Sequence, residues 1–144
     1  MEGLTTIPSS FGAKETMDRL AAEIRSHNMV IFARIDHSTG AAEAGLVLLP
    51  TELIIFGNAR AGTPLMQAEQ TVGIDLPLKA LVWENAARKT WISYNEPGWI
   101  VQRHNVSGAE VIVNNMAAAL AVVTRNAAGL SADGGVVRVR QVAE

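Results

Sequence analysis

The stretch that decides the fold is LKALVWE (residues 78–84), followed after a short polar loop by TWISY (residues 90–94). Both segments are rich in the β-branched and aromatic residues that favour strands. In the second segment Thr90, Ile92 and Tyr94 alternate with Trp91, Ser93 and Asn95. A short loop at residues 85–88 separates the two runs, so the pattern predicts an antiparallel hairpin.

Three further runs of strand-forming residues lie outside this hairpin, at residues 4–8, 29–35 and 52–56. In the second run, alternation predicts one face made of Met29, Ile31, Ala33 and Ile35. The other face would then carry Val30, Phe32, Arg34 and Asp36. Because this second face ends in an arginine and an aspartate, we expect it to become solvent-exposed or functional toward the end of the strand.

Two long helices are predicted around these strands. In residues 10–27, one apolar stripe combines Ala13, Met17, Leu20, Ala21 and Ile24. Ser9 or Ser10 is a suitable N-cap for this helix, because a hydroxyl oxygen can accept from a free backbone N–H. The second helix, at residues 108–126, has a main stripe of Ile112, Met116, Leu120 and Val123. Its apolar arc is wide, which indicates cover on more than one side, by the chain's own tail or by another subunit.

Short helices are predicted at residues 40–44, 63–69 and 97–104, the second with Thr63 as N-cap and Pro64 at its first position. Strands interrupted by two long helices favour an α+β fold, with a single, mostly antiparallel sheet and two main helices on one face. A doubly wound parallel sheet would need more long crossover helices. We expect one domain over residues 1–128 and a C-terminal extension over residues 129–144 that forms an edge strand or an arm.

Composition excludes several classes of protein. The chain has 144 residues, of which 49% are hydrophobic and 18% charged, so it is not a disordered chain. It has no cysteine, which excludes disulfides, thiolate metal sites and a cysteine nucleophile. A net charge of -2 gives no reason to expect nucleic acid as a partner. Without a signal-like N-terminus or an apolar run of about 20 residues, we expect a soluble, cytoplasmic protein with no membrane partner.

Several motifs follow one another in an order that resembles a known family. They are FARIDH (residues 32–37), FGN (56–58), PLM (64–66), GIDLPLK (73–79) and YNEP (94–97). Over residues 4–127 the set resembles the family named domain of unknown function 302 (DUF302), although Ala59 stands where the family usually has proline. The resemblance implies a β-α-β4-α topology, similar to half of the TATA-binding protein, and a tendency to dimerise. It implies no established reaction, and a shared architecture is not evidence of DNA binding.

Polar residues at the predicted strand ends are candidates for a binding site. The set consists of Asp36, His37, Asn58, Tyr94, Asn95, Arg103 and His104. A structural reading is favoured for Asp36 and His37, in which they stabilise a turn. The histidines at 27, 37 and 104 lack the spacing of metal ligands, so we expect no metal. Neither a phosphate-binding glycine motif nor a serine nucleophile motif is present, and we expect no cofactor.

Three functions remain open. The first is a homodimeric module that binds or senses a small molecule of unknown identity, through the candidate residues. The second is a small enzyme in which His37 or His104, oriented by Asp36, acts in acid–base chemistry. The third is a structural or interaction domain that uses the apolar arc of residues 112–123 as its interface.

Overall fold

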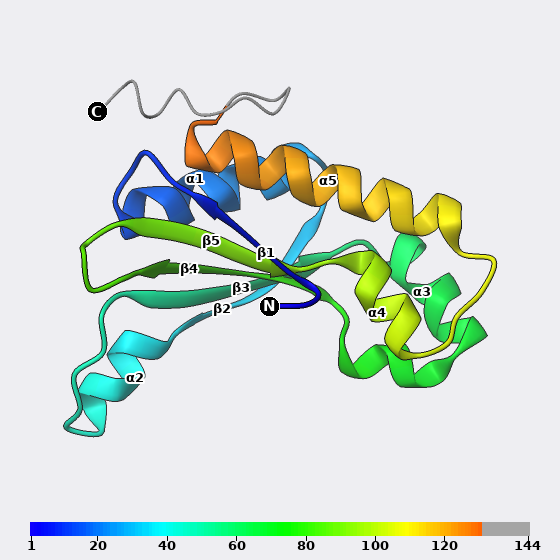
Figure 1. Ribbon diagram of the computed structural model, residues 1–144, viewed down its shortest axis with the longest axis horizontal. Helices are drawn as coiled ribbons and strands as arrows, with labels where there is room; N and C mark the ends of the chain where they lie inside the picture. Colours follow the sequence, from blue (N-terminus) through cyan, green and yellow to red (C-terminus); the bar gives the residue numbers. More distant parts are fainter. Residues whose placement is uncertain (131–144) are drawn as a thin grey trace.

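A computed structural model describes residues 1–130 of the chain (Figure 1). Five strands form one antiparallel sheet in the order β1-β5-β4-β3-β2. They are β1 (Leu4–Pro8), β2 (Val30–Asp36), β3 (Thr51–Gly57), β4 (Leu78–Glu84) and β5 (Thr90–Asn95). The hairpin predicted from residues 78–94 is confirmed, with Trp83 opposite Trp91 and Ala80 opposite Tyr94. The predicted extension at residues 129–144 falls almost entirely outside the described residues.

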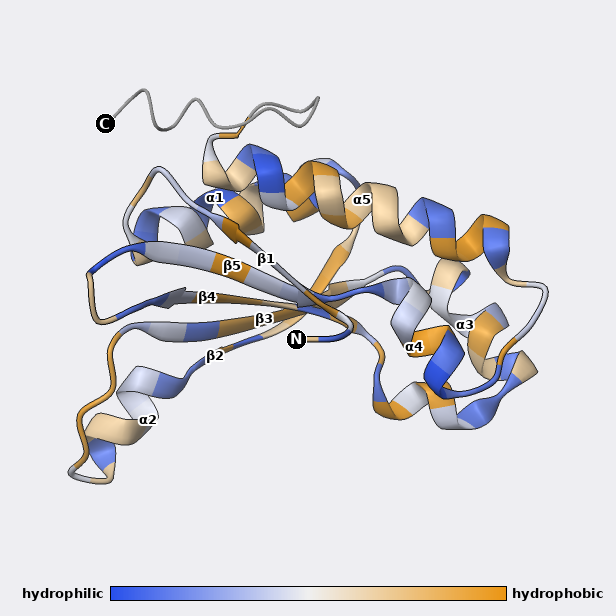
Figure 2. Cartoon of the chain, viewed as in Figure 1, coloured by the Kyte–Doolittle hydropathy of each residue, from blue (hydrophilic) through white to orange (hydrophobic). Residues whose placement is uncertain are grey.

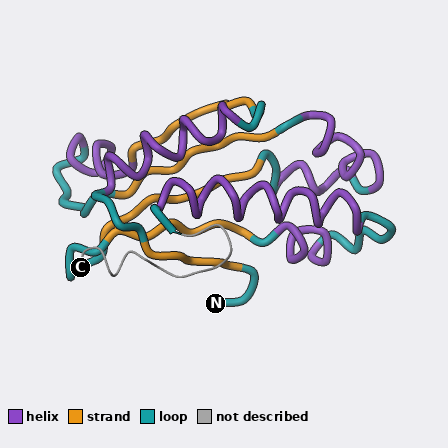
Figure 3. The backbone as a smooth tube through the Cα atoms, turned by 90° about the horizontal axis from the view of Figure 1, so that it is seen from above, coloured by secondary structure: helices purple, strands orange, loops and turns teal. Residues whose placement is uncertain are grey.

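Two long helices, α1 (Ala13–Ser26) and α5 (Glu110–Ala128), lie side by side over one face of the sheet (Figures 1 and 3). This arrangement confirms the predicted α+β class. The apolar core lies between the helices and the sheet, where the largest fully buried side chains include Met17, Leu20, Ile24, Ile54, Phe56, Leu120 and Val123. Most of the predicted apolar stripe of α5 therefore packs inside the chain's own core, since Met116, Leu120 and Val123 are buried and Ile112 is partly buried.

Helix α5 is also the one helix within residues 1–130 that is long and apolar enough to cross a membrane, judged by length and composition alone. In this fold 33% of that stretch is buried. Met116, Leu120 and Val123 point into the core, and Arg19 of α1 donates to the carbonyl oxygens of Asn126 and Ala127. The helix is thus part of the sheet-covering layer.

The shorter helices are α2 (His37–Glu43), α3 (Ala59–Ala68) and α4 (Pro97–Arg103), with a 3₁₀ turn, η1, at Gln70–Ile74. Three predicted helix starts are wrong. Helix α2 begins at His37 instead of residue 40, because Asp36 Oδ1 accepts from the Thr39 N–H and caps the helix there. Helix α1 begins after Gly12 without a side-chain cap, because the Ser9 hydroxyl is taken up by Thr16 Oγ1 at 2.6 Å and by the Phe11 N–H. Helix α3 begins at Ala59, because Asn58 Oδ1 accepts from the Arg60 N–H at 2.8 Å and caps the helix there.

The alternation predicted for β2 is also wrong, because the strand contains a bulge. Ile31 pairs with Phe56 and Ala33 pairs with the next residue back, Ile55, so Phe32 is an extra residue between them. An extra residue shifts the strand's alternation from that point on. Ile31 therefore faces the helices, whereas Ala33 and Ile35 lie on the open face of the sheet.

Candidate functional site

A cavity of about 500 Å³ opens beside the end of the sheet where β3 passes into α3. Its floor includes Gly62, Leu78 and Met116, which are buried. Its rim includes Phe32 and Asn115, which are exposed. Concave sites of this size, mostly apolar with a few polar groups, are typical of small-molecule sites in proteins.

Local structure explains how the cavity forms. The β2 bulge places Phe32, 56% exposed, on the helix side of the sheet, against the cavity. The cap at Asn58 turns the chain from β3 directly into α3, so that Ala61 and Gly62 form one wall. The middle of α5 supplies the opposite wall through Asn115, Met116 and Ala119.

The polar side chains of the cavity are the amides of Asn58 and Asn115, the Thr63 hydroxyl and the His27 imidazole. Asn58 uses Oδ1 to cap α3. His27, at the end of α1, holds its Nδ1 at 2.9 Å from the Glu23 carbonyl oxygen and 3.3 Å from Ser26 Oγ. In the described residues, no aspartate, glutamate, lysine or arginine lines the cavity. The site is therefore suited to an uncharged ligand.

A second polar cluster lies beside α4, around the Asp75 carboxylate. His104 Nε2 is 2.6 Å from Asp75 Oδ2, and Arg103 Nη1 donates to both carboxylate oxygens at 2.8 and 2.9 Å. His104 Nδ1 is 2.8 Å from Thr71 Oγ1. Since the His104 side chain is 8% exposed and both ring nitrogens have protein partners, the cluster fastens α4 to η1.

Asp36 and His37 lie at the opposite end of the sheet. Asp36 pairs with Glu52 at the start of β3, whereas Asn58 follows the far end of that strand. Glu52 and Asn58 are six positions apart along the strand, which corresponds to about 20 Å. The structure therefore does not bring Asp36 and His37 into one pocket with Asn58, and α2 and α4 lie at opposite ends of the molecule (Figure 1).

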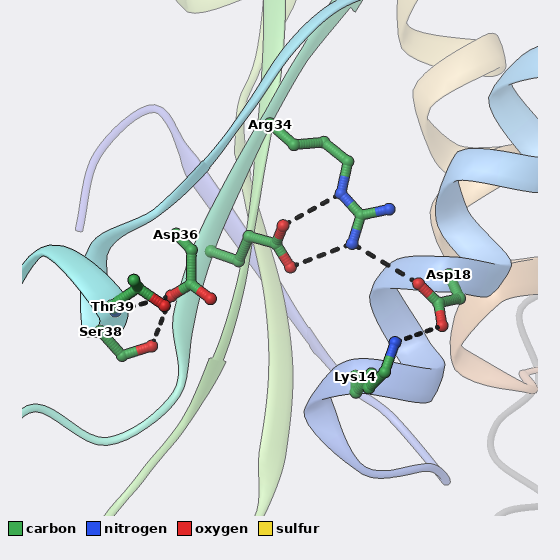
Figure 4. Close-up of polar contacts among 7 residues, drawn as sticks. Lys14, Asp18, Arg34, Asp36, Ser38 and Thr39 are labelled. Atoms are coloured by element: carbon green, nitrogen blue, oxygen red, sulfur yellow. Dashed lines mark hydrogen bonds and ion pairs between the residues drawn. The ribbon is translucent and has the colours of Figure 1, made fainter.

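Asp36 serves as the N-cap of α2 (Figure 4). Its Oδ1 accepts from Ser38 Oγ at 2.6 Å and from the Thr39 N–H at 3.1 Å. The Ser38 hydroxyl, followed by the Thr39 N–H, holds the pKa of Asp36 below its ordinary value. This geometry matches the structural reading of Asp36. His37, the first residue of α2, is exposed.

The C-terminal part of β2 carries a network of charged side chains on the side of the sheet that faces the helices (Figure 4). Arg34 donates to Glu52 at 3.0 and 3.2 Å and reaches Asp18 of α1 at 3.5 Å, while Lys14 lies 3.1 Å from Asp18. The bond to Glu52 is the main reason that the pKa of Arg34 is raised. These contacts join α1 to the edge of the sheet.

The remaining candidates lie in separate surroundings. Tyr94 is 8% exposed within the core, and burial raises its pKa. Asn95 ends β5 and pairs with Leu4. Of the seven candidate residues, only Asn58 lines the cavity, while Arg103 and His104 belong to the Asp75 cluster. Ligand binding by the other candidates stays a prediction.

Sequence reasoning missed five polar residues of these sites: His27, Thr63 and Asn115 at the cavity, and Thr71 and Asp75 in the second cluster. Asp75 stood within the motif that carried the family resemblance, but nothing in its spacing pointed to His104. His27 and Asn115 had no local signal, because they approach the cavity from two helices far apart in the sequence. Within residues 1–130 no group of three or more His, Asp or Glu side chains is placed to hold a metal ion.

Comparisons with known proteins agree with this architecture. The chain is 47% identical over 128 residues to proteins named "Fluoride-specific ion channel FluC 1" from Brucella suis biovar 1 and Brucella abortus biovar 1. The match covers 88% of this chain but 50% and 47% of those two relatives, so the chain spans about half of their length.

The fold matches the crystal structure of an uncharacterized conserved protein from Bacillus stearothermophilus, described as DUF302. That match has a TM-score of 0.79 at 20% sequence identity and covers 89% of this chain and 99% of the other. A family model described as "Domain of unknown function DUF302" matches residues 5–123, close to the span of the resemblance seen in the sequence. The chain therefore belongs to the DUF302 family.

Proposed function

We propose that this chain is a cytoplasmic ligand-binding or sensor domain, and that its site is the cavity between β2, α3 and α5. The observation that carries the proposal is the cavity itself, about 500 Å³ in volume and closed at its floor by Leu78 and Met116. An open cavity of this kind exposes apolar side chains to water, at a cost in free energy that is proportional to the apolar area exposed. A bound small molecule covers those side chains.

The side chains around the cavity are suited to an adaptable fit. Met29, Met66 and Met116 come from three different segments. Methionine is unbranched and polarisable, so it can follow the outline of an irregular ligand. Three methionines around one cavity favour a binding site for a molecule with an apolar body.

The relatives named as fluoride channels suggest a second part of the proposal. Since the chain matches only about half of their length, a domain of this kind in a longer protein would report ligand binding to the remainder. The cavity itself is a poor site for a fluoride ion. It presents no cationic side chain from the described residues to offset the loss of the ion's hydration.

The test is a ligand screen read by NMR chemical shifts and thermal stability, with sodium fluoride included. Ala119→Leu extends a side chain into the cavity, whereas Ala118→Leu places the same group on the exposed side of α5. We expect ligands found with the wild type to bind the Ala118 variant equally and the Ala119 variant more weakly. Equal binding to both variants, or no ligand from a broad screen, would refute the proposed site.

Homodimerisation belongs to the same proposal, and the surface that we favour for it is the sheet face opposite the helices rather than α5. The sheet face opposite the helices carries an apolar set that is half-buried except for Ile35, which is 41% exposed. It is here named the open face: Ile35, Leu53, Ile55, Leu81, Trp83 and Trp91. In this face the two tryptophan rings are stacked, with centroids 6.3 Å apart. An antiparallel sheet exposed to water ordinarily carries polar residues on that side. A second copy of this chain, related by a two-fold axis, would cover the same apolar set on both subunits.

Helix α2 and the loop after it extend this surface. None of the residues of α2 is buried, and Leu46, Val47 and Leu48 are 67%, 99% and 46% exposed. The loop after α2 is strongly apolar (Figure 2). Helix α2 lies on the side of the sheet opposite α1 and α5 (Figure 1). In this position, α2 and the apolar loop after it can contact a second subunit packed on the open face.

Light scattering after size exclusion tests the dimer. We expect a dimer for the wild type and for Ala118→Glu, whose new charge lies on α5, and a monomer for Leu81→Glu, whose charge lies in the open face. A monomeric wild type at micromolar concentration would remove this part of the proposal.

The enzyme alternative has one observation in its favour, the 2.6 Å contact between His104 and Asp75. It involves Asp75 rather than Asp36, which the sequence had offered as the orienting carboxylate. A general base needs a nitrogen lone pair facing its substrate. His104 has partners on both nitrogens and is 8% exposed, so we assign it a structural role.

A further inference from the structure

We propose that the ligand of this cavity is an uncharged molecule with a compact hydrocarbon body and one oxygen function, a hydroxyl being the best fit. This inference rests on the proposed function and names its ligand class. It follows from Asn58 and His27, which each have one hydrogen-bonding atom used by the protein and another left. The other polar side chains of the lining, Thr63 and Asn115, can each donate and accept, so they are compatible with the same hydroxyl group.

Asn58 is left with a donor. Only an oxygen can accept from the Arg60 N–H, so the 2.8 Å cap contact fixes which end of the amide is Oδ1. The Nδ2 group is therefore the part of this side chain left for a ligand. It donates, and the group that it recognises must carry an acceptor oxygen.

His27 is left with an acceptor. Around Nδ1 lie the Glu23 carbonyl oxygen at 2.9 Å, Ser26 Oγ at 3.3 Å and Glu23 Oε1 at 3.9 Å. A carbonyl oxygen can only accept, so Nδ1 carries the proton in the neutral ring and Nε2 carries the lone pair. Nothing else in residues 1–130 bonds to Nε2. A hydroxyl group is able both to accept from an amide N–H and to donate to an imidazole nitrogen, whereas a ketone can only accept.

The remainder of the cavity selects the body of the ligand. Met66, Leu76, Leu78 and Met116 form apolar walls, and no charged side chain of the described chain lines them. A carboxylate or an ammonium group would lose its hydration there without gaining a counter-ion. A hydrocarbon body gains free energy in proportion to the apolar area that it buries.

A matched series on one rigid skeleton tests this ligand class: adamantanol, adamantanone, adamantane carboxylate and adamantyl ammonium. Binding is measured by titration of each compound into the protein with NMR detection. We expect the alcohol to bind best, the ketone several-fold more weakly, and the two ions at least tenfold more weakly than the alcohol. An ion that binds as well as the alcohol would overturn the inference.

Two variants separate the ligand class from the site. Asn58→Asp keeps an oxygen to cap α3 but removes the Nδ2 donor, so we expect roughly three- to tenfold weaker binding of both alcohol and ketone with the fold intact. His27→Phe should weaken the alcohol to the level of the ketone and leave the ketone unchanged. If both variants bind the series as the wild type does while Ala119→Leu abolishes binding, the site stands and the ligand class is wrong. If Ala119→Leu changes nothing, or no member of the series binds, the inference is overturned, and the broad screen decides the site itself.

Discussion

Replacing Gly62 by alanine should stabilise the protein and narrow its cavity at the same time. Gly62 is a buried residue inside α3. A Cβ at this position would lie 3.5 Å from Leu76 Cδ1 and 3.9 Å from Met66 Cε, which are ordinary van der Waals distances. No neighbour has to move, so the sign of the effect is set by the helix. Alanine within a helix is favoured over glycine by roughly 0.5–1 kcal/mol.

The new methyl group also contacts Leu76, so the total gain is about 1 kcal/mol. For a domain of this length that gain corresponds to a rise in Tm of about 2–5 °C. The same methyl group stands on the cavity wall, where it competes with ligand. Calorimetry and a ligand titration together should thus show a more stable protein that binds more weakly. A merely damaged fold would lose both stability and affinity.

Gly129→Ala is the matched control of opposite sign. Gly129 has φ +80°, and its Cβ would lie 2.9 Å from Phe11 Cε2 and 3.1 Å from Ser10 Oγ. An L residue in this left-handed conformation costs about 1–2 kcal/mol before any overlap is counted. We expect the Tm to fall by several degrees. A Gly62→Ala variant less stable than the wild type, or a Gly129→Ala variant as stable as the wild type, would refute the conformational argument made for these two glycines.

The remaining predictions concern the other polar sites. Asp75→Asn should destabilise the fold by about 1.5–3 kcal/mol, because it weakens the charged contacts to His104 and Arg103, whereas Arg103→Ala, whose side chain is 51% exposed, should cost less than about 1 kcal/mol. Tyr94→Phe should flatten the alkaline loss of stability. Burial raises the pKa of Tyr94 above the ordinary 10.0. The stability that the neutral Tyr94 side chain contributes to the fold is therefore complete below pH 10.0 and is lost as the pH rises further. Asp36→Ala should fray α2 by about 1 kcal/mol without changing the global Tm.

Each of these has a direct measurement. Urea unfolding compares the stability of the Asp75 and Arg103 variants. An equal loss of stability in both would contradict the prediction, which rests on Asp75 being more buried than Arg103. Unfolding across alkaline pH compares Tyr94→Phe with the wild type, and parallel curves would show that Tyr94 is not responsible. Hydrogen exchange follows the amides of α2, and unchanged protection after loss of the Asp36 carboxylate would mean that Thr39 has another acceptor.

The sequence was a good guide to the elements that alternate or repeat over several turns. The hairpin of β4 and β5 follows from strict alternation, and α1 follows from a single apolar stripe. Helix starts were less well predicted, because caps compete. Thr63 and Pro64 form a valid start signal, but Asn58 lies earlier in the chain and caps first.

Features that depend on contacts between distant segments could not be predicted. The bulge at Phe32 has no marker in its own strand, since it is defined by which residues of β3 lie opposite. The pairing of Asp75 with His104 joins residues 29 positions apart. His27 comes from the end of α1, and its place beside Asn58 is visible only once the helix is packed on the sheet.

The irregular features of this fold meet at one place, which is itself an argument for the cavity as the functional site. The bulge at Phe32 interrupts the ladder between β2 and β3 and turns an aromatic side chain toward the cavity. The Oδ1 atom of Asn58 accepts the hydrogen bond that caps α3, and its Nδ2 donor is left for a ligand. His27 lies at the end of α1, where its Nδ1 is bonded to the Glu23 carbonyl oxygen and its Nε2 is left for a ligand. Such departures from regular structure weaken a fold locally, and they are expected where function requires them. Because none of the three side chains belongs to the buried core, variants that keep the Asn58 cap, such as Asn58→Asp and His27→Phe, should change ligand binding far more than stability.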